Sequence, residues 1–585
     1  MGALIVGSNG DGLRSLSLTP NDPNAANSNT TAIQAALNAG GTVQILGAGT
    51  YYVLGDNFNT AANPEVVIAP GVQFSFGGAV GPLVSLTNSL IRNKVNVSGA
   101  SRALLIGDSM AYFTWVQATT ATGVIDNGDG TATITFSGSH SFVVGDPIAV
   151  NAAPDRKFNV MDGVVTARVN SGTFTATYTL GGRTSSVTSA TPTAFYPRFT
   201  NPQAWYPWLE LLLGQKYALT MCAAGGADTA QALDLLSQTP KAQYDECFIN
   251  IGTNDIYARG NTFAQVQTGL IKLINAARLY SANVTVLLIP PRANTSAAWS
   301  AGKRDIHLQI NRWLWDYCRT LGITPVDTFR SVANALTYIA AASVEADPTA
   351  NFNSSDGVHP SNLGGIAIAT DVYNAVKNRF GGGTGFKFSH AKLATGTGSF
   401  NLLTNPGFTG TGGTKTIGTG TITGNVPDSW TLENTSGSPA LTTTIAARSV
   451  ASDGDAYGNN FQIACVYGGA GTNIYRLINT TSIHGSVTAG QSYKLRLQVS
   501  LTSVTGLTGI ELVVFGSAGG GGNPSAYALQ GTAQVIAQNL SGALETPPWT
   551  APASGLTSLL VFLRVYHSSG GSTLVVSKPE FVPVV

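Results

Sequence analysis

The 585-residue chain is too long for one hydrophobic core, so three or four domains are expected. Only 10% of its residues are charged and 68 are glycine, a composition that favours neutral, turn-rich β structure over long charged helices. A formal net charge of +1 provides no basic footprint for nucleic acid. No apolar stretch is long enough to cross a bilayer, so membrane insertion is not expected.

The four cysteines are scattered and match no metal-ligand spacing. Because a free thiol in a buried strand behaves as a small apolar residue, all four are predicted to be reduced. They are Cys222, Cys247, Cys318 and Cys465. No metal-binding cluster is apparent, so neither a metal nor another cofactor is expected. The N-terminus lacks a basic segment followed by an apolar core, and no secretory signal is expected.

Residues 1–98 are predicted to form a small β-rich domain with one helix. Asn29-Thr30-Thr31 can cap a helix over 32–38, and Gly40-Gly41 can end it. Strands are expected over 42–46 and 50–53. The order of helix, Gly-Gly and the sequence GAGTYYV resembles the opening segment of pectate-lyase-like β-helix proteins, which is common in bacteriophage tailspikes. The alternative is a generic β-roll with a helix lid.

The continuous apolar run Ala103–Ile106 fits a strand buried on both faces. It leads directly into Gly107-Asp108-Ser109-Met110, and a helix is predicted from there through Gln117. This order puts Ser109 at a helix N-terminus, where its oxygen and its backbone N–H face a crevice. A Gly-Asp-Ser tripeptide alone is usually only a turn.

Residues 119–194 are predicted to form a small β domain inserted into the α/β domain. Asp126–Gly130 is a turn signal, and Thr131–Phe136 alternates with the period of a strand. Further short strands are expected over 143–144, 163–169 and 173–180. The insertion is expected near the mouth of the site, where it either gates or binds substrate, or is a spacer without substrate contact.

The α/β pattern then resumes with a helix over 205–214 and a strand over 218–221. The aromatic residues of this helix are expected in the core rather than on a sugar-stacking surface. Ala223-Ala-Gly-Gly226 forms a glycine turn before a helix over 228–237. Such a turn exposes a backbone N–H at a helix start, which is a natural donor for a developing oxyanion.

A buried strand over 247–251 ends in Gly252-Thr253-Asn254-Asp255, which points polar groups into the crevice at the strand's C-terminal end. Alternating helices and strands follow, over 263–280, 284–289, 306–321 and 323–326. Short connections between alternating elements predict a doubly wound sheet of about five parallel strands.

The segment Asp356-Gly-Val-His359 lies in an expected loop before a helix over 364–378. A carboxylate three residues ahead of a histidine can accept from one ring nitrogen and hold the other toward a hydroxyl. These two groups are the orienting carboxylate and the base of a nucleophile triad.

Together the segments GDSM, GGADT, GTND and DGVH occur in the order of the four blocks of the SGNH (GDSL-type) hydrolase family, which they resemble. The resemblance spans residue 103 to about 380 and is interrupted by the insertion. It implies a three-layer α/β/α domain with a parallel sheet. It also implies that Ser109 is the nucleophile, His359 the general base and Asp356 its orienting partner, with an oxyanion hole formed by Ser109 N–H, Gly226 N–H and the Asn254 side chain.

The second block departs from the family pattern, because Cys222-Ala-Ala occupies the place where the family usually has an asparagine. Either Gly225 or Gly226 can therefore supply the donor. We prefer Gly226, since it keeps the spacing to Thr229 and Leu233. Asp108 and Asp255 are expected to bond turn amides, with tuning of the site as the alternative role. The remaining histidines are expected to be surface or core residues. Those histidines are His140, His307, His390, His484 and His567.

Residues 381–398 are predicted to be a glycine-rich linker, and residues 399–585 a C-terminal β-sandwich with strands over 493–501, 509–515 and 558–566. The hydrolase domain thus covers 99–380. The sequence NLLTNPGF, followed by VPDSW, resembles the start of carbohydrate-binding jelly-roll modules. Trp430 is expected in the core rather than on a ligand platform. Glycan binding, or stabilisation of the fold and of a trimer, are both open for this domain.

The resulting hypothesis is a phage tailspike esterase that removes O-acetyl or other acyl groups from a bacterial surface polysaccharide, such as capsule or O-antigen. It would sit on the virion tail with other tail proteins, act at the host cell surface and form a homotrimer. One alternative is a glycan-binding adhesin whose hydrolase domain is not catalytic. Another is a bacterial carboxylesterase or lipase, which would carry a signal peptide and an apolar lid.

Overall fold

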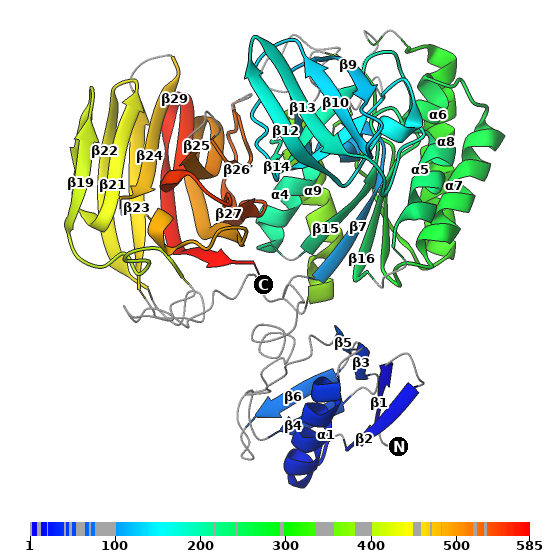
Figure 1. Ribbon diagram of the computed structural model, residues 1–585, viewed down its shortest axis with the longest axis horizontal. Coiled ribbons are helices and arrows are strands. Elements are labelled where there is room, and N and C mark those ends of the chain that lie inside the picture. The colour runs from blue at the N-terminus through cyan, green and yellow to red at the C-terminus, as the bar shows by residue number, and fades with distance from the viewer. Residues whose placement is uncertain are drawn as a thin grey trace. The chain divides into compact units, whose positions relative to one another are not determined.

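The computed structural model divides into two compact units, Met1–Ser101 and Arg102–Val584 (Figure 1). None of the described helices is long and apolar enough to cross a membrane. The described residues are 3–8, 13–19, 21–39, 42–45, 49–53, 65–68, 72–76, 101–215, 217–240, 244–292, 296, 298–330, 332–333, 356–380, 401–448, 458–467, 471–480, 483–518, 523–531 and 535–584.

The described residues of the first unit contain a four-stranded sheet of order β2-β1-β3-β5, a parallel pair β4–β6 and the helix α1. The helix, α1, spans Ala26–Ala39 and so begins earlier than predicted. The predicted cap residues lie inside it, where the hydroxyls of Thr30 and Thr31 bond to carbonyls one turn back. The predicted stop, Gly40-Gly41, lies outside the described residues. The strands are β1 Ala3–Ser8, β2 Leu13–Leu18, β3 Thr42–Ile45, β4 Gly49–Val53, β5 Glu65–Ile68 and β6 Val72–Phe76.

The second unit contains a five-stranded sheet of order β15-β7-β16-β17-β18. The pairs β7–β16, β16–β17 and β17–β18 are parallel, as predicted for a doubly wound sheet. The strands are β7 Ser101–Gly107, β15 Tyr217–Ala223, β16 Glu246–Asn250, β17 Val284–Leu287 and β18 Thr324–Val326. In this order β7 and β16 are neighbours, so the polar residues that follow them meet at one edge of the sheet.

Helices cover both faces of this sheet, with α4 and α9 on one side and α5, α7 and α8 on the other (Figure 1). Their buried faces recur at helical spacing, as in α7, where Val266, Leu270 and Leu273 lie inside. The helices are α3 Ser109–Tyr112, α4 Trp205–Leu213, α5 Thr229–Gln238, α6 Thr253–Tyr257, α7 Phe263–Ala277, α8 Ala301–Thr320 and α9 Asn362–Val376. Elsewhere in the described residues, 3₁₀ helices cover Pro23–Ala25, Arg156–Phe158, Lys377–Phe380 and His484–Ser486.

One predicted helix of this region is wrong. We expected helix from Ser109 through Gln117, but α3 ends at Tyr112 and Trp115–Gln117 form strand β8. The aromatic and β-branched residues there prefer a pleated surface, and β8 pairs with β14.

The insertion consists of short antiparallel strands, β9 to β14. The predicted strand at 143–144 is wrong, because these residues form a turn. In this turn the Val143 N–H donates to the Asp146 carboxylate at 2.6 Å. Asp146 also pairs with the buried Arg198 at 2.8 Å, which fixes the base of the insertion. The strands are β9 Ala121–Asp126, β10 Thr131–Phe136, β11 Pro147–Asn151, β12 Gly163–Ser171, β13 Thr173–Thr179 and β14 Thr193–Thr200.

The C-terminal region is a large β-rich structure built around two long strands, β25 (Ser492–Ala518) and β29 (Leu556–Pro583). Each long strand contributes to two sets of neighbours, because β23 pairs with one half of β29 and β24 with the other half. Likewise β27 and β26 pair with opposite halves of β25. The other strands are β19 Gly412–Ile417, β20 Thr421–Thr423, β21 Val426–Ser436, β22 Pro439–Ala447, β23 Asn459–Tyr467, β24 Asn473–Asn479, β26 Ser525–Ala528, β27 Leu540–Glu545 and β28 Trp549–Thr550.

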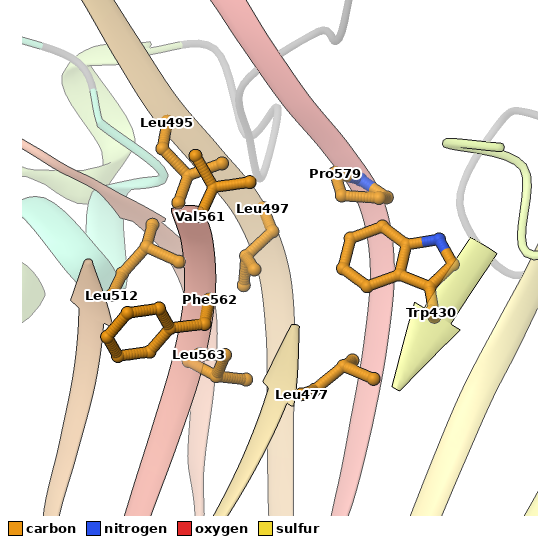
Figure 2. A pocket seen from close by; sticks show the side chains of 9 residues that line it. All are labelled: Trp430, Leu477, Leu495, Leu497, Leu512, Val561, Phe562, Leu563 and Pro579. Carbon is orange, nitrogen blue, oxygen red and sulfur yellow. The ribbon is translucent and has the colours of Figure 1, made fainter. Parts of the chain in front are cut away.

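Trp430 belongs to the core of this region, as expected. Its side chain is buried, its Nε1 donates to the Asn405 carbonyl at 2.9 Å, and its ring lines a small apolar cavity with Leu477 and Leu563 (Figure 2). A tryptophan enclosed by aliphatic side chains offers no face to a sugar.

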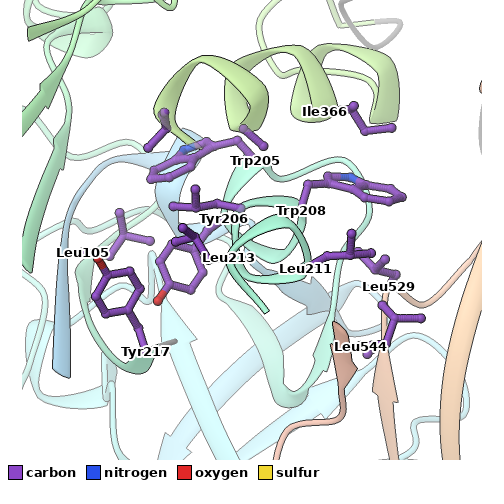
Figure 3. Close-up of a cluster of buried hydrophobic side chains, with 14 of the residues drawn as sticks. Leu105, Trp205, Tyr206, Trp208, Leu211, Leu213, Tyr217, Ile366, Leu529 and Leu544 are labelled. Atoms are coloured by element: carbon purple, nitrogen blue, oxygen red, sulfur yellow. The ribbon is translucent and has the colours of Figure 1, made fainter. Parts of the chain in front are cut away.

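The hydrophobic core is continuous from the α/β domain into the C-terminal region. Trp208 of α4 is buried near Leu529 and Leu544 of the C-terminal region, whereas Trp205 of the same helix packs against Phe248 of β16 (Figure 3). Gln215 Nε2 donates to the Ala543 carbonyl at 2.8 Å across the same junction. The aromatic cluster of this helix is therefore core, as predicted. All four cysteines are buried and none of them is in a disulfide.

Candidate active site

Backbone hydrogen bonds connect the C-terminal ends of three adjacent strands, at the edge of the sheet where the predicted site residues lie. The Gly107 carbonyl accepts from Ala224 N–H at 3.3 Å, and Asp108 N–H donates to the Asn250 carbonyl at 3.4 Å. These bonds link the loops after β7, β15 and β16. They bring Ser109, the Gly225-Gly226 turn and Asn254 to one place.

Ser109 is the first residue of α3 and is 7% exposed. Asp108 caps this helix by accepting the Met110 N–H at 2.9 Å. The N–H of a first helical residue has no acceptor within its own helix. The Ser109 N–H is therefore not used within α3, and the residue is nearly buried.

The second block forms a tight turn in which Ala227 N–H donates to the Ala224 carbonyl at 3.1 Å. Gly226 has φ +82°, which is the third position of a type II turn and favours glycine. Within the described ranges, neither the Gly225 nor the Gly226 N–H has a hydrogen-bond acceptor. The structure therefore leaves both candidate donors open to a ligand.

Asn254 lies beside this turn and donates through Nδ2 to the Ala227 carbonyl at 3.0 Å. It is carried by the short helix α6 rather than by an irregular loop. The residue that precedes this helix is Gly252, where φ is +119° and an added Cβ would lie 2.6 Å from Ile289 Cδ1. The amide has two N–H groups, so one is held by the turn and the other remains for an oxyanion.

Asp255 has a structural role, but it bonds to the start of helix α5 and not only to its own turn. Its carboxylate accepts the Thr229 N–H at 3.0 Å and the Thr229 hydroxyl at 2.6 Å. Burial raises the pKa of Asp255 to about 6, against the lowering effect of these bonds. The residue ties the third block to the start of α5, next to the glycine turn.

Asp356 and His359 form the pair expected from their spacing. One carboxylate oxygen of Asp356 accepts the backbone N–H groups of Val358 and His359 at 2.8 and 3.0 Å, and the other pairs with His359 Nδ1. Burial alone would raise the pKa of Asp356, but the bonds from His359 hold it below its usual range. The carboxylate is therefore ionised and fixes the ring orientation.

The ring of His359 lies beside the helix that Ser109 begins. The His359 ring lies 4.4 Å from the ring of Phe113, which caps the helix that Ser109 begins. His359 Nε2 is buried and has no hydrogen-bond partner. No bond joins it to Ser109 Oγ among the described atoms, and catalytic hydrogen bonds are often long until a substrate is bound.

Arg292 is a site residue that the sequence reasoning missed. It is 8% exposed, its Nε donates to the Thr253 hydroxyl at 3.1 Å, and its guanidinium lies 4.8 Å from the centre of the Tyr257 ring. Its charge acts on both Asp108 and Asp356. The available signal was a charged residue just beyond the C-terminal end of a parallel strand.

Asp108 is expected to make the protein less stable as the pH rises toward neutrality. Burial raises its pKa to about 7, although Met110 N–H and Arg292 lower it. The folded state then keeps a proton that the unfolded state releases, so stability is full below about pH 4 and falls by up to about 1.4 kcal/mol per pH unit until about pH 7. Asp108→Asn keeps a capping oxygen and cannot titrate. Urea unfolding should show its stability relative to the wild type increasing from pH 4.5 to 7, whereas a constant difference would contradict the prediction.

The other described histidines are core or surface residues, as predicted, because His140, His307 and His567 are buried and His484 is exposed. His307 bonds to the Tyr257 hydroxyl and the Ile289 carbonyl, and His567 bonds to the Ser572 hydroxyl. His140 bonds to the Thr175 carbonyl, whereas His390 lies outside the described residues. In the described part of the chain no group of three or more His, Cys, Asp or Glu could hold a metal ion.

A serine at a helix start, a histidine oriented by a carboxylate and open N–H donors are the groups of a serine-dependent ester hydrolase. Residues 184–365 match the GDSL-like Lipase/Acylhydrolase family. The chain therefore contains a GDSL-like acylhydrolase domain, and ester hydrolysis of that type is supported. The match includes the second, third and fourth blocks and begins after Ser109.

Solved structures of the same kind are similar over part of the chain. A putative acylhydrolase from Bacteroides fragilis is 18% identical over 28% of this chain and 75% of that chain, with a TM-score of 0.24. A putative arylesterase from Agrobacterium tumefaciens is 22% identical over 30% and 86%, with a TM-score of 0.23. The enzymatically active domain of bacteriophage CBA120 tailspike protein 4 is 12% identical over 27% and 19%, with a TM-score of 0.19. The search of curated proteins found no match.

Proposed function

We propose that this chain is a serine esterase that removes O-acetyl or related acyl groups from a bacterial surface polysaccharide, such as capsule or O-antigen. The observation that carries the esterase chemistry is the Asp356–His359 pair, whose free Nε2 is buried beside the helix that begins at Ser109. The open N–H groups of the glycine turn and the Asn254 amide supply the complementary donors.

In the proposed reaction, His359 Nε2 takes the hydroxyl proton of Ser109 as Oγ attacks the ester carbonyl. Negative charge develops on the carbonyl oxygen and is met by Ser109 N–H, Gly226 N–H and Asn254 Nδ2. The sugar hydroxyl leaves with the proton from His359. Water then attacks the acyl-serine, again with His359 as base, and releases the carboxylic acid and free Ser109.

The polysaccharide substrate is proposed from features outside the triad. Charged residues are only 10% of the chain, which suits a neutral surface in contact with hydrated sugars. A large β-rich region shares a continuous core with the hydrolase domain, so it can hold an extended polymer in a fixed relation to the site. The N-terminal resemblance to tailspike segments motivates the further proposal of a homotrimeric virion tail protein that acts with other tail proteins at the host surface.

The test is acetate release from purified, O-acetylated capsular polysaccharide or lipopolysaccharide. We expect the wild type to release acetate and Ser109→Ala to release none, with alkali-deacetylated polysaccharide as the blank. Turnover of lipid esters without acetate release from any polysaccharide would indicate a lipase or carboxylesterase. Polysaccharide binding without any ester hydrolysis would indicate an adhesin with a non-catalytic domain.

A further inference from the structure

We propose that Asn151, contributed by the inserted β domain, is a positioning residue of the oxyanion hole. Asn151 ends strand β11, is 2% exposed and donates through Nδ2 to the Gly225 carbonyl at 2.9 Å. The proposal rests on the esterase function above and assigns to the insertion a part in it. Asn151 itself touches no reacting atom and acts through the glycine turn.

The bond from Asn151 determines where the Gly226 N–H points. The Gly225 carbonyl and the Gly226 N–H belong to one planar peptide and point in opposite directions. Type I and type II turns differ mainly by a flip of this central peptide, and two glycines permit both forms. Gly226 φ of +82° corresponds to the type II form. A donor fixed on the Gly225 carbonyl opposes the flip and so keeps the Gly226 N–H in one direction.

The insertion also holds the turn by packing. Val187 forms a small buried cluster with Ala224 and Ala227, and an added Cβ on Gly226 would lie 3.7 Å from Val187 Cγ1. Asn159 ties the two contacting segments of the insertion together, because its amide donates to the Val187 carbonyl at 2.6 Å and its oxygen accepts the Ala153 N–H at 2.8 Å. The segment that follows Asn151 is therefore hydrogen-bonded to the segment that packs on the turn.

Fold stability alone does not account for an amide at this position. The Oδ1 atom of Asn151 is buried and has no hydrogen-bond partner. A buried acceptor without a partner destabilises a fold, and an apolar side chain would avoid that loss. The amide of Asn151 adds a hydrogen bond to the Gly225 carbonyl. This carbonyl belongs to the same peptide as the Gly226 N–H, which is the proposed oxyanion donor.

The test compares Asn151→Ala and Asn151→Asp with the wild type on a small acetyl ester. We expect kcat to fall roughly tenfold or more while KM changes by less than about threefold, because the donor is needed in the transition state. Asn151→Asp has almost the same shape but places a carboxylate against the Gly225 carbonyl, so its kcat should fall at least as far. Phosphonylation of Ser109 by a fluorophosphonate should slow in parallel.

The control is Asn170→Ala, which removes two partly buried hydrogen bonds elsewhere in the insertion, one accepted from the His140 N–H and one donated to the His140 carbonyl. It should lower the melting temperature without changing kcat. Asn151 variants with wild-type kcat would overturn the proposal. So would a crystal structure of Asn151→Ala with the Gly225-Gly226 peptide unmoved, whether or not the protein is active. The esterase function itself is tested separately, by comparing hydrolysis by the wild type with hydrolysis by Ser109→Ala.

Discussion

Replacing Ser109 with alanine is expected to lower kcat for a simple acetyl ester by roughly 10⁴-fold or more. Without the hydroxyl there is no covalent intermediate, and His359 has no proton to take. Ser109 is only 7% exposed and its replacement removes one oxygen, so α3 should stay folded. Initial rates with an aryl acetate, at equal concentrations of folded protein, measure the effect.

A double variant shows whether the two residues work as a unit. Ser109→Ala combined with His359→Ala should be no slower than either single variant, because a base without its nucleophile contributes little. Ser237→Ala is the matched control, since this exposed serine bonds only to the Asp234 carbonyl one turn back on α5. Additive losses in the double variant, or a slow Ser237→Ala, would contradict the assigned roles.

The parts of the site that could be predicted are those that depend on local sequence. Buried apolar runs followed by polar turns place Ser109 and Asn254 at strand ends, and parallel strands bring those ends to one edge. The three-residue spacing of Asp356 and His359 is short enough to predict their pairing, which the structure shows. In each case one segment of chain carries both the signal and the geometry.

The contribution of Asn151 could not be predicted from the sequence. Asn151 and Gly225 are 74 positions apart, and only the fold of the insertion brings them together. The sequence left open whether the insertion contacts the site, and its contact turns out to be with the glycine turn. The early end of α3 has a similar cause. Trp115 and Val116 pair with strand β14 and so adopt a strand conformation. This tertiary pairing overrides the helical pattern of the local sequence.

The second block has Cys222-Ala-Ala where the SGNH pattern it resembles usually has an asparagine. In this chain the amide of Asn151, from strand β11, donates to the Gly225 carbonyl of the glycine turn. The carbonyl of Gly225 is held by a residue outside the four blocks. An oxyanion site can thus depend on a segment that the family pattern does not include.

Replacing Asp356 with asparagine is expected to lower kcat by roughly 10³-fold to 10⁴-fold while the loop keeps its shape. The asparagine oxygen can still accept the N–H groups of Val358 and His359, as one carboxylate oxygen does now. Its NH₂ group would then face His359 Nδ1 and favour the tautomer with the proton on Nε2. In that tautomer Nε2 cannot accept the Ser109 proton.

The pH dependence separates this effect from titration of Asp356. Because the pKa of Asp356 is held below its usual range, its charge and its stabilising bond are present at neutral pH and are lost only in strong acid. The deficit of Asp356→Asn should therefore persist across neutral and mildly alkaline pH. Asp155→Asn is the control, since Asp155 accepts the Lys157 N–H in a similar local turn within the insertion. Asp356→Asn with more than about a tenth of wild-type kcat would show that His359 does not need this carboxylate. The tautomer of His359 with the proton on Nε2 should lower kcat by far more than tenfold.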